Sequence, residues 1–146
     1  MVSMHIIGLS EFQAAFIKVG AQADQAAKAS VQEGTKYFLN QAINGFEGSH
    51  AAGEPHVGGN KPNVVTGNLR RSLKAQGIEH IGIGEWSGTA GPSMAYARRV
   101  ELGAKGPDSL GRIMNSRPFP YVQPAYDELQ KKLPSIVATN WTKYVI

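Results

Sequence analysis

Hydrophobic positions recur every three or four residues over the first third of the chain, which is the spacing of a stripe along one face of a helix. The stripe comprises Leu9, Phe12, Phe16, Val19, Ala23, Ala26 and Ser30. The helical pattern continues to about Asn44. Because Ser10 and Gln13 have the spacing of a capping box, we predict one helix that begins near Glu11.

This predicted helix is long for a chain of 146 residues. About 35 residues span roughly 50 Å, which is more than one such domain can cover, so we expect part of the helix to contact neighbouring subunits. Its alanine-rich run, residues 21–29, would let another helix approach closely. The high helix propensity of alanine explains the run equally well, and the sequence leaves both interpretations open.

Residues 47–65 contain several glycines and prolines, little hydrophobic content and no periodicity, which predicts a long surface loop. Loops of this length usually carry function or are disordered. We expect this loop to be the docking element of an assembly, held in place by an adjacent subunit or ordered when a partner arrives.

Shorter elements are predicted after the loop. Thr66 is a good N-cap for a short helix that places Leu69 and Leu73 on one face. The pattern over residues 76–90 predicts two short strands that form a hairpin turning near Gly84.

The last third of the chain predicts a short helix, a loop and a long helix. The short helix covers residues 96–100 and should end at Gly103 as a left-handed C-cap. Residues 104–120 are predicted as a loop, which prolines keep extended at its end. The final helix should begin near Pro124, and Pro134 should kink or split it.

The composition fits one domain covering residues 1–146. Its formal charge of +4 is a modest excess, which allows contact with DNA without requiring it. The absence of cysteine excludes a disulfide scaffold and thiolate chemistry, and suits a reducing cytoplasm. No segment has the pattern of a signal peptide or of a membrane-spanning helix, so we expect neither export nor a membrane partner.

We find no constellation that indicates catalysis, a cofactor or a metal. Residues 82–84 (Gly-Ile-Gly) lack the rest of a dinucleotide fingerprint, and residues 58–61 lack the ending of a phosphate loop. The histidines do not have the spacing of metal ligands; they are His5, His50, His56 and His80. Because no nucleophile elbow or acid-base pair is present either, we expect no enzyme activity and no cofactor.

Basic residues could touch a phosphate backbone through unspecific, salt-sensitive contacts. They are Arg70, Arg71, Lys74, Arg98, Arg99, Lys131 and Lys132. We favour ordinary solvated helix faces or ion pairs between subunits, because no aromatic residues are interleaved with these charges as single-strand stacking requires. A small basic DNA-binding module stays as an alternative function.

Three blocks of sequence follow one another in a distinctive order. They are residues 66–73 (Thr-Gly-Asn-Leu-Arg-Arg-Ser-Leu), 96–103 (Tyr-Ala-Arg-Arg-Val-Glu-Leu-Gly) and 117–125 (Arg-Pro-Phe-Pro-Tyr-Val-Gln-Pro-Ala). Together they resemble the head-to-tail joining proteins of long-tailed bacteriophages, the neck or tail-completion family, whose members run T-G-x-L-R-x-S, Y-A-x-x-V-E-x-G and R-P-F-x-x-P-A. The chain departs from the family pattern at Leu102 and Ala104, where an aromatic residue and threonine are common, and at Pro120.

The resemblance implies an α+β fold, in which a small, mostly antiparallel sheet is flanked by a long N-terminal helix and a C-terminal helix. It also implies a structural virion protein that forms a ring, usually a hexamer, at the head-tail junction. There it would complete the tail or join it to the DNA-filled head, after assembly in the host bacterial cytoplasm. A tail-terminator ring is the alternative position, since related folds serve both.

The expected partners follow from that position in the virion. One ring face would contact the head-closure (stopper) protein, and the other would contact the tail-terminator or tail-tube protein. Genomic DNA would pass through the lumen without sequence-specific binding.

Eight residues are the expected contacts of such a ring with its neighbours or partners. The hydrophobic anchors are Trp86, Tyr96, Phe119 and Tyr121, and the polar contacts are Arg70, Arg71, Glu101 and Arg117. Glu101 adjoins an apolar cluster, where a carboxylate is costly to desolvate unless it is paired. We expect Arg117 or Arg70 to pair with it, and we favour a structural role for that pair.

Overall fold

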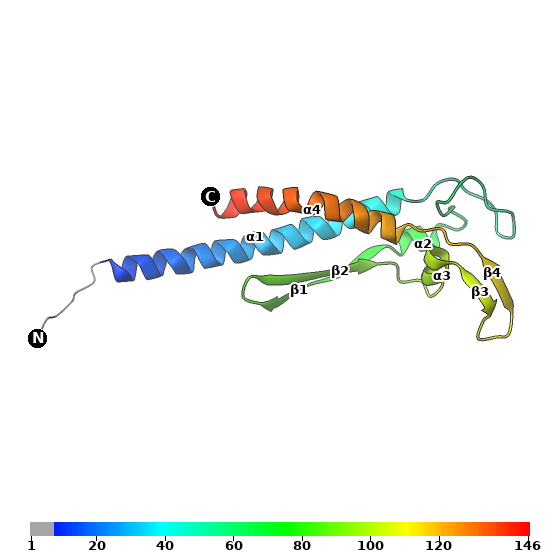
Figure 1. Cartoon of the computed structure of the whole chain (residues 1–146), viewed down its shortest axis with the longest axis horizontal. Helices are drawn as coiled ribbons and strands as arrows, with labels where there is room; N and C mark the ends of the chain where they lie inside the picture. Colours follow the sequence, from blue (N-terminus) through cyan, green and yellow to red (C-terminus); the bar gives the residue numbers. More distant parts are fainter. Residues whose placement is uncertain (1–7) are drawn as a thin grey trace, which may run out of the picture.

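The computed structural model describes residues 8–146; residues 1–7, which include His5, lie outside the described part. Two long antiparallel helices form the body of the molecule, and the small elements lie below them and at one end (Figure 1). The elements are α1 (Leu9–Asn44), α2 (Asn68–Arg71), β1 (Lys74–Gly82), β2 (Glu85–Gly91), α3 (Ala97–Leu102), β3 (Ala104–Pro107), β4 (Ile113–Ser116) and α4 (Val122–Tyr144). The predicted α+β arrangement is confirmed, with two separate antiparallel hairpins as its sheets.

Helix α1 runs as one continuous element, as its hydrophobic periodicity predicts. The predicted capping box is wrong. The helix follows Gly8, whose φ of 88° no side chain favours, and the Ser10 hydroxyl donates to the Glu11 carboxylate instead of capping the backbone. A glycine just before the first turn therefore sets the helix start.

Helix α4 packs antiparallel along the second half of α1. Gly34 of α1 lies in this contact, where a Cβ would make ordinary van der Waals contact, at 3.6 Å, with the Cδ1 atoms of Leu129 and Leu133. Asn140 is buried in the same contact, and its amide donates to Glu33 and to the Ile136 carbonyl at 2.9 and 3.0 Å. Pro134 does not split the helix: α4 continues through it to Tyr144.

The hairpin of β1 and β2 packs across α1, close to the predicted bounds. Gly88 marks the closest approach of β2 to α1, since a Cβ there would lie 2.9 Å from Val31 Cγ1 and against the Thr35 hydroxyl. This is a contact that only glycine allows. Close packing against α1 therefore explains the glycine at position 88 of β2.

A second hairpin, β3 and β4, occupies the segment that was predicted as a loop, so that prediction is wrong for residues 104–116. Asp108 closes its turn by accepting the Leu110 and Arg112 amides, both at 2.9 Å, and the Arg112 guanidinium. The guanidinium of Arg112 is the main reason why the pKa of Asp108 lies below its usual value. Each strand has only four residues, too short for a clear alternation pattern.

The buried core is small and lies where α1, the short helices and the start of α4 meet. It comprises Ala42, Leu69, Leu73, Ala97, Tyr121 and Ala125. Leu69 and Leu73, which were predicted to share one face, are both buried in this core. Within residues 8–146, no helix combines the length and the hydrophobicity needed to cross a membrane.

The molecule exposes far more surface than a compact chain of its size. Its accessible area is 10405 Å², whereas a compact monomer of this mass exposes about 7,300 Å². Full exposure of residues 1–7 would account for only about 1,100 Å² of the excess. Most of the excess therefore comes from the elongated shape of the described part.

Candidate interaction surfaces

The three sequence blocks named above converge on one cavity of about 360 Å³ at the end of the molecule distant from the start of α1. Leu69 and Arg70 come from the first block, Tyr96 and Val100 from the second, and Phe119 from the third. Loop residues between 46 and 67 form the rest of the wall. The structure therefore brings together three of the eight predicted contacts, Arg70, Tyr96 and Phe119.

The loop over residues 47–65 is held by stacking against the third block. The His56 ring stacks on the Phe119 ring with centroids 4.0 Å apart. The Arg117 guanidinium also lies 4.8 Å from the centroid of the Phe119 ring. Arg117 also donates to the Gly59 carbonyl at 3.1 Å. Asn63 ties the loop internally by bonding both the amide and the carbonyl of Val57. Contacts within the chain thus hold this loop, and its role as a docking element stays a prediction.

Glu101 is paired, but the prediction of an arginine partner is wrong. Its carboxylate accepts the backbone amides of Tyr121, Val122 and Gln123 at 2.8 to 2.9 Å. The first four amides of a helix have no partner within the helix, and the fourth position here is Pro124, which has no N–H. One side chain from α3 therefore satisfies every orphan donor at the start of α4.

Tyr121 belongs to the core of the chain itself. Its side chain is 1% exposed and packs against Phe46 with ring centroids 5.1 Å apart. The residue was predicted as an interface anchor, but in this structure its ring is not accessible to a partner. Its hydroxyl is buried without a hydrogen-bond partner in the described part of the chain.

Replacing Tyr121 with phenylalanine is expected to leave the free energy of unfolding unchanged or to raise it by about 1 kcal/mol, because an unsatisfied buried hydroxyl is removed. Burial, and secondarily the Glu101 charge, raises the pKa of Tyr121 to about 12. Folding therefore keeps the phenol neutral, so the protein with Tyr121 loses stability as the pH rises from about 10 towards 12, where the unfolded chain ionises first. Urea titrations of both proteins at neutral and alkaline pH check this; a loss above about 2 kcal/mol at neutral pH would show an unrecognised partner for the hydroxyl.

Trp86 lies on β2 and fixes the hairpin tip to α1. Its indole N–H donates to Asp24 at 3.0 Å, and the Gly84 amide donates to the same carboxylate oxygen at 3.1 Å. His80 lies 3.4 Å from that oxygen, and the Lys28 ammonium lies 4.9 Å from the indole centroid. A single carboxylate on α1 thus gathers three groups of the hairpin.

Replacing Asp24 with alanine should release the hairpin tip and shift Trp86 emission to longer wavelength. The hydrogen bond from Trp86 is the main reason that the pKa of Asp24 lies below its usual value of 3.8. Its contribution is therefore present above that value and is lost only as the pH falls through the lowered one. An acid titration of Trp86 fluorescence in a Trp141→Phe background checks this; identical titration curves with and without the Asp24→Ala change would contradict the assignment.

A larger depression, which we call the apolar groove, runs between the hairpin and α4 with α1 as its floor. Its volume is about 900 Å³. Small residues of α1 line the floor, among them Ala23, Ala27 and Gly34, whereas the walls carry Trp86 and Trp141. The sequence did not single out this groove, although the alanine-rich run was noted as a surface that another helix could approach.

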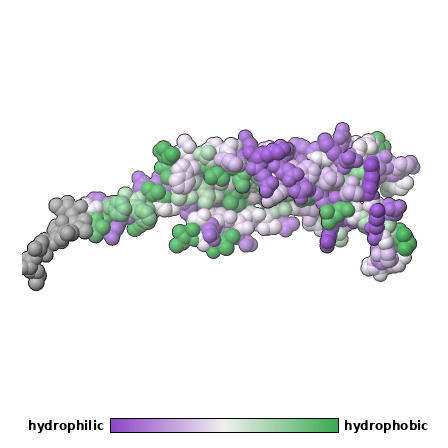
Figure 2. All heavy atoms as spheres, in the orientation of Figure 1, coloured by the Kyte–Doolittle hydropathy of each residue, from purple (hydrophilic) through white to green (hydrophobic). Residues whose placement is uncertain are grey.

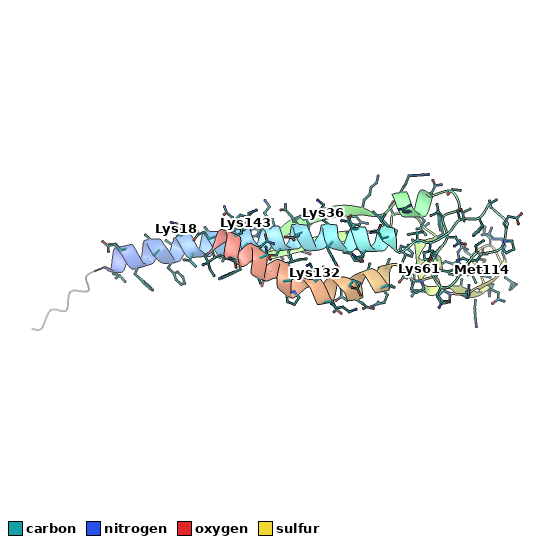
Figure 3. All side chains as sticks on the ribbon, turned by 90° about the horizontal axis from the view of Figure 1, so that it is seen from above. Lys18, Lys36, Lys61, Met114, Lys132 and Lys143 are labelled. Atoms are coloured by element: carbon teal, nitrogen blue, oxygen red, sulfur yellow. The ribbon has the colours of Figure 1, made fainter. Side chains whose placement is uncertain are left out.

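The basic residues lie on several elements. Arg71 donates to the Thr66 carbonyl and to Asn68, whereas Arg99 contacts Met114. Figure 3 labels Lys18, Lys36, Lys132 and Lys143 at intervals along the two long helices. The two long helices therefore carry lysines, whereas all the arginines lie between residues 70 and 117, on or near the short elements.

Among the residues that the structure describes, no three histidine, aspartate or glutamate side chains lie together as metal ligands. The chain was also compared with known proteins. No protein-family model matches it, and neither the curated proteins nor the solved structures gave a significant match.

Proposed function

We propose that this chain is a structural subunit of a bacteriophage neck, where it forms a ring that completes the tail or joins it to the DNA-filled head. The observation that carries the proposal is the exposed hydrophobic surface. Phe12 and Phe16 are each about 70% exposed, and Ile83 is 99% exposed. Large hydrophobic side chains exposed to this extent favour association with another surface.

The three sequence blocks support the same proposal. They resemble the neck family in sequence, and residues from all three line one cavity. Side chains brought together from separate segments form a surface that a partner can recognise as a unit. Arg70, Arg71, Tyr96 and Phe119 are the contacts that we propose for a partner ring or for a neighbouring subunit, because they lie on or beside this cavity.

Joining of heads and tails tests the proposal. Purified protein is added to DNA-filled heads and to tails that lack it, and joined particles are counted by electron microscopy. Addition of the protein should raise the number of joined particles and leave the protein bound at the junction. If joining proceeds equally well without it, the proposal fails.

The DNA-binding alternative makes a different prediction. A basic module would bind free duplex with an affinity that falls steeply with salt, in proportion to the number of phosphates contacted. A neck subunit should show weak binding without sequence preference and should bind particles in preference to free DNA. Titrations at two salt concentrations separate the two functions.

A further inference from the structure

The first part of α1 projects beyond the rest of the molecule (Figure 1). Every residue from Leu9 to Ala21, which we call the projecting segment, is exposed. Hydrophobic atoms nevertheless line this segment (Figure 2), and its aromatic residues Phe12 and Phe16 are 66% and 71% exposed. An amphipathic helix whose apolar face is uncovered requires another surface to bury that face.

The apolar groove has the features of an acceptor for a helix. Its floor is made by Ala23, Ala27 and Gly34, which lie on the same face of α1 as Phe12 and Phe16 when residues advance by 100° each. One stripe of α1 therefore carries large side chains where it projects and small ones where it forms the groove floor. Large side chains can enter only where the facing ones are small.

Both surfaces are also nearly free of charged residues. Glu11 and Lys18 of the projecting segment lie on the face opposite to Phe12 and Phe16, so the apolar face carries no charge. Glu85 is the one charged residue of the groove lining, which is otherwise hydrophobic or small. Docking along this face would therefore desolvate few charges.

The lengths and areas are compatible as well. From Leu9 to Val19 the segment measures about 15 Å, and the floor from Ala23 to Phe38 measures about 22 Å. A specific contact buries about 800 Å² per partner, of which two phenylalanines at this exposure supply roughly 200 to 350 Å². Leu9, Val19 and the hairpin residue Ile81, which are 48%, 46% and 66% exposed, can extend the contact.

We propose that the projecting segment of one copy lies in the apolar groove of a second copy. Since α1 is one continuous helix, the segment cannot reach the groove of its own chain. The contact joins two different surfaces, so each copy donates a helix to one neighbour and accepts a helix from the other. Repetition of such a head-to-tail contact closes into a ring when the rotation permits. The inference rests on the proposed function for the ring, but its test uses the purified protein alone.

Phe16→Ser removes the donor surface without disturbing the buried core, because Phe16 is exposed. Its self-association should weaken at least about tenfold, as expected for an aromatic anchor. Ile17→Ser is the matched control: Ile17 is also 71% exposed, but lies about 100° around the helix from Phe16. Its association should stay within about threefold of the unchanged protein, as measured by sedimentation. Equal effects of the two changes, or no effect of either, would overturn the proposal.

Val137→Lys blocks the acceptor surface, since Val137 lines the groove and is 45% exposed, so a charge there is tolerated until a helix covers it. Ala27→Phe, which fills the floor, is a second acceptor variant. At a concentration where the unchanged protein associates and a contact about tenfold weaker does not form, the Phe16→Ser and Val137→Lys proteins should each be monomeric alone. When mixed in equal amounts they should form a one-to-one heterodimer that grows no further, because one intact donor meets one intact acceptor.

Tryptophan emission reports whether the groove is the surface that becomes covered. The chain has two tryptophans, and both Trp86 and Trp141 line the groove. Heterodimer formation should therefore shift their emission to shorter wavelength. Absence of a heterodimer, or a heterodimer without this shift, contradicts the proposal, and neither result bears on whether the protein joins heads to tails.

Discussion

Replacing Glu101 with glutamine is expected to lower the free energy of unfolding by about 3 kcal/mol, with a fall in Tm of about 10 °C. The carboxylate accepts three amides at the start of α4. Glutamine retains one oxygen and turns an N–H₂ group towards backbone donors, which leaves at least one of the three amides without its acceptor. The change also removes a negative charge from the positive end of the helix dipole.

The matched control is Glu79→Gln, since Glu79 lies exposed on β1. It should change the free energy of unfolding by no more than about 0.5 kcal/mol. Urea denaturation followed by circular dichroism measures both variants. Equal stability of the two variants would mean that solvent, not Glu101, satisfies the start of α4.

Gly103→Ala should cost still more, about 4 kcal/mol of folding free energy. Gly103 ends α3 with a φ of 72° and a ψ of 179°, a conformation reserved for glycine. A Cβ at this position would lie 2.7 Å from the Ser116 carbonyl oxygen and 2.9 Å from the Pro118 nitrogen. These are backbone atoms, so no side-chain rotation can relieve the contact.

The Gly106→Ala variant is the control that has the backbone strain of a positive φ without a steric clash. Gly106 has a φ of 90°, but a Cβ there would meet nothing within 4 Å. Its substitution should cost only the conformational penalty, about 1 to 2 kcal/mol. Thermal unfolding of both variants gives the comparison, and a Gly103→Ala protein no less stable than the Gly106→Ala protein would contradict the close packing of α3 against residues 116–118.

The long elements could be predicted because their patterns are local. The periodicity of α1 and the turn at Gly84 both depend on neighbours in sequence, and both are confirmed. The hairpin of β3 and β4 was missed because two four-residue strands contain too few hydrophobic positions to reveal an alternation. Its turn depends on Asp108 accepting amides, which residue type alone does not specify.

The candidate surfaces were predicted less completely. The cost of desolvating a carboxylate predicted that Glu101 needs a partner. Its partners are backbone amides twenty or more residues away, and backbone amides have no sequence signature. Tyr121 was taken for an anchor because aromatic residues are common at interfaces, and the core encloses it instead. The groove arises only when the hairpin and α4 flank α1, so no single segment could disclose it.

The mass of the purified protein in solution, measured by light scattering across concentration with and without tail tubes or DNA-filled heads, tests the proposed neck role most directly. We expect a closed ring of six copies, which forms either in solution or on the particles. A protein that stays monomeric under all these conditions, ignores both particles and binds free DNA in a salt-sensitive manner would contradict it.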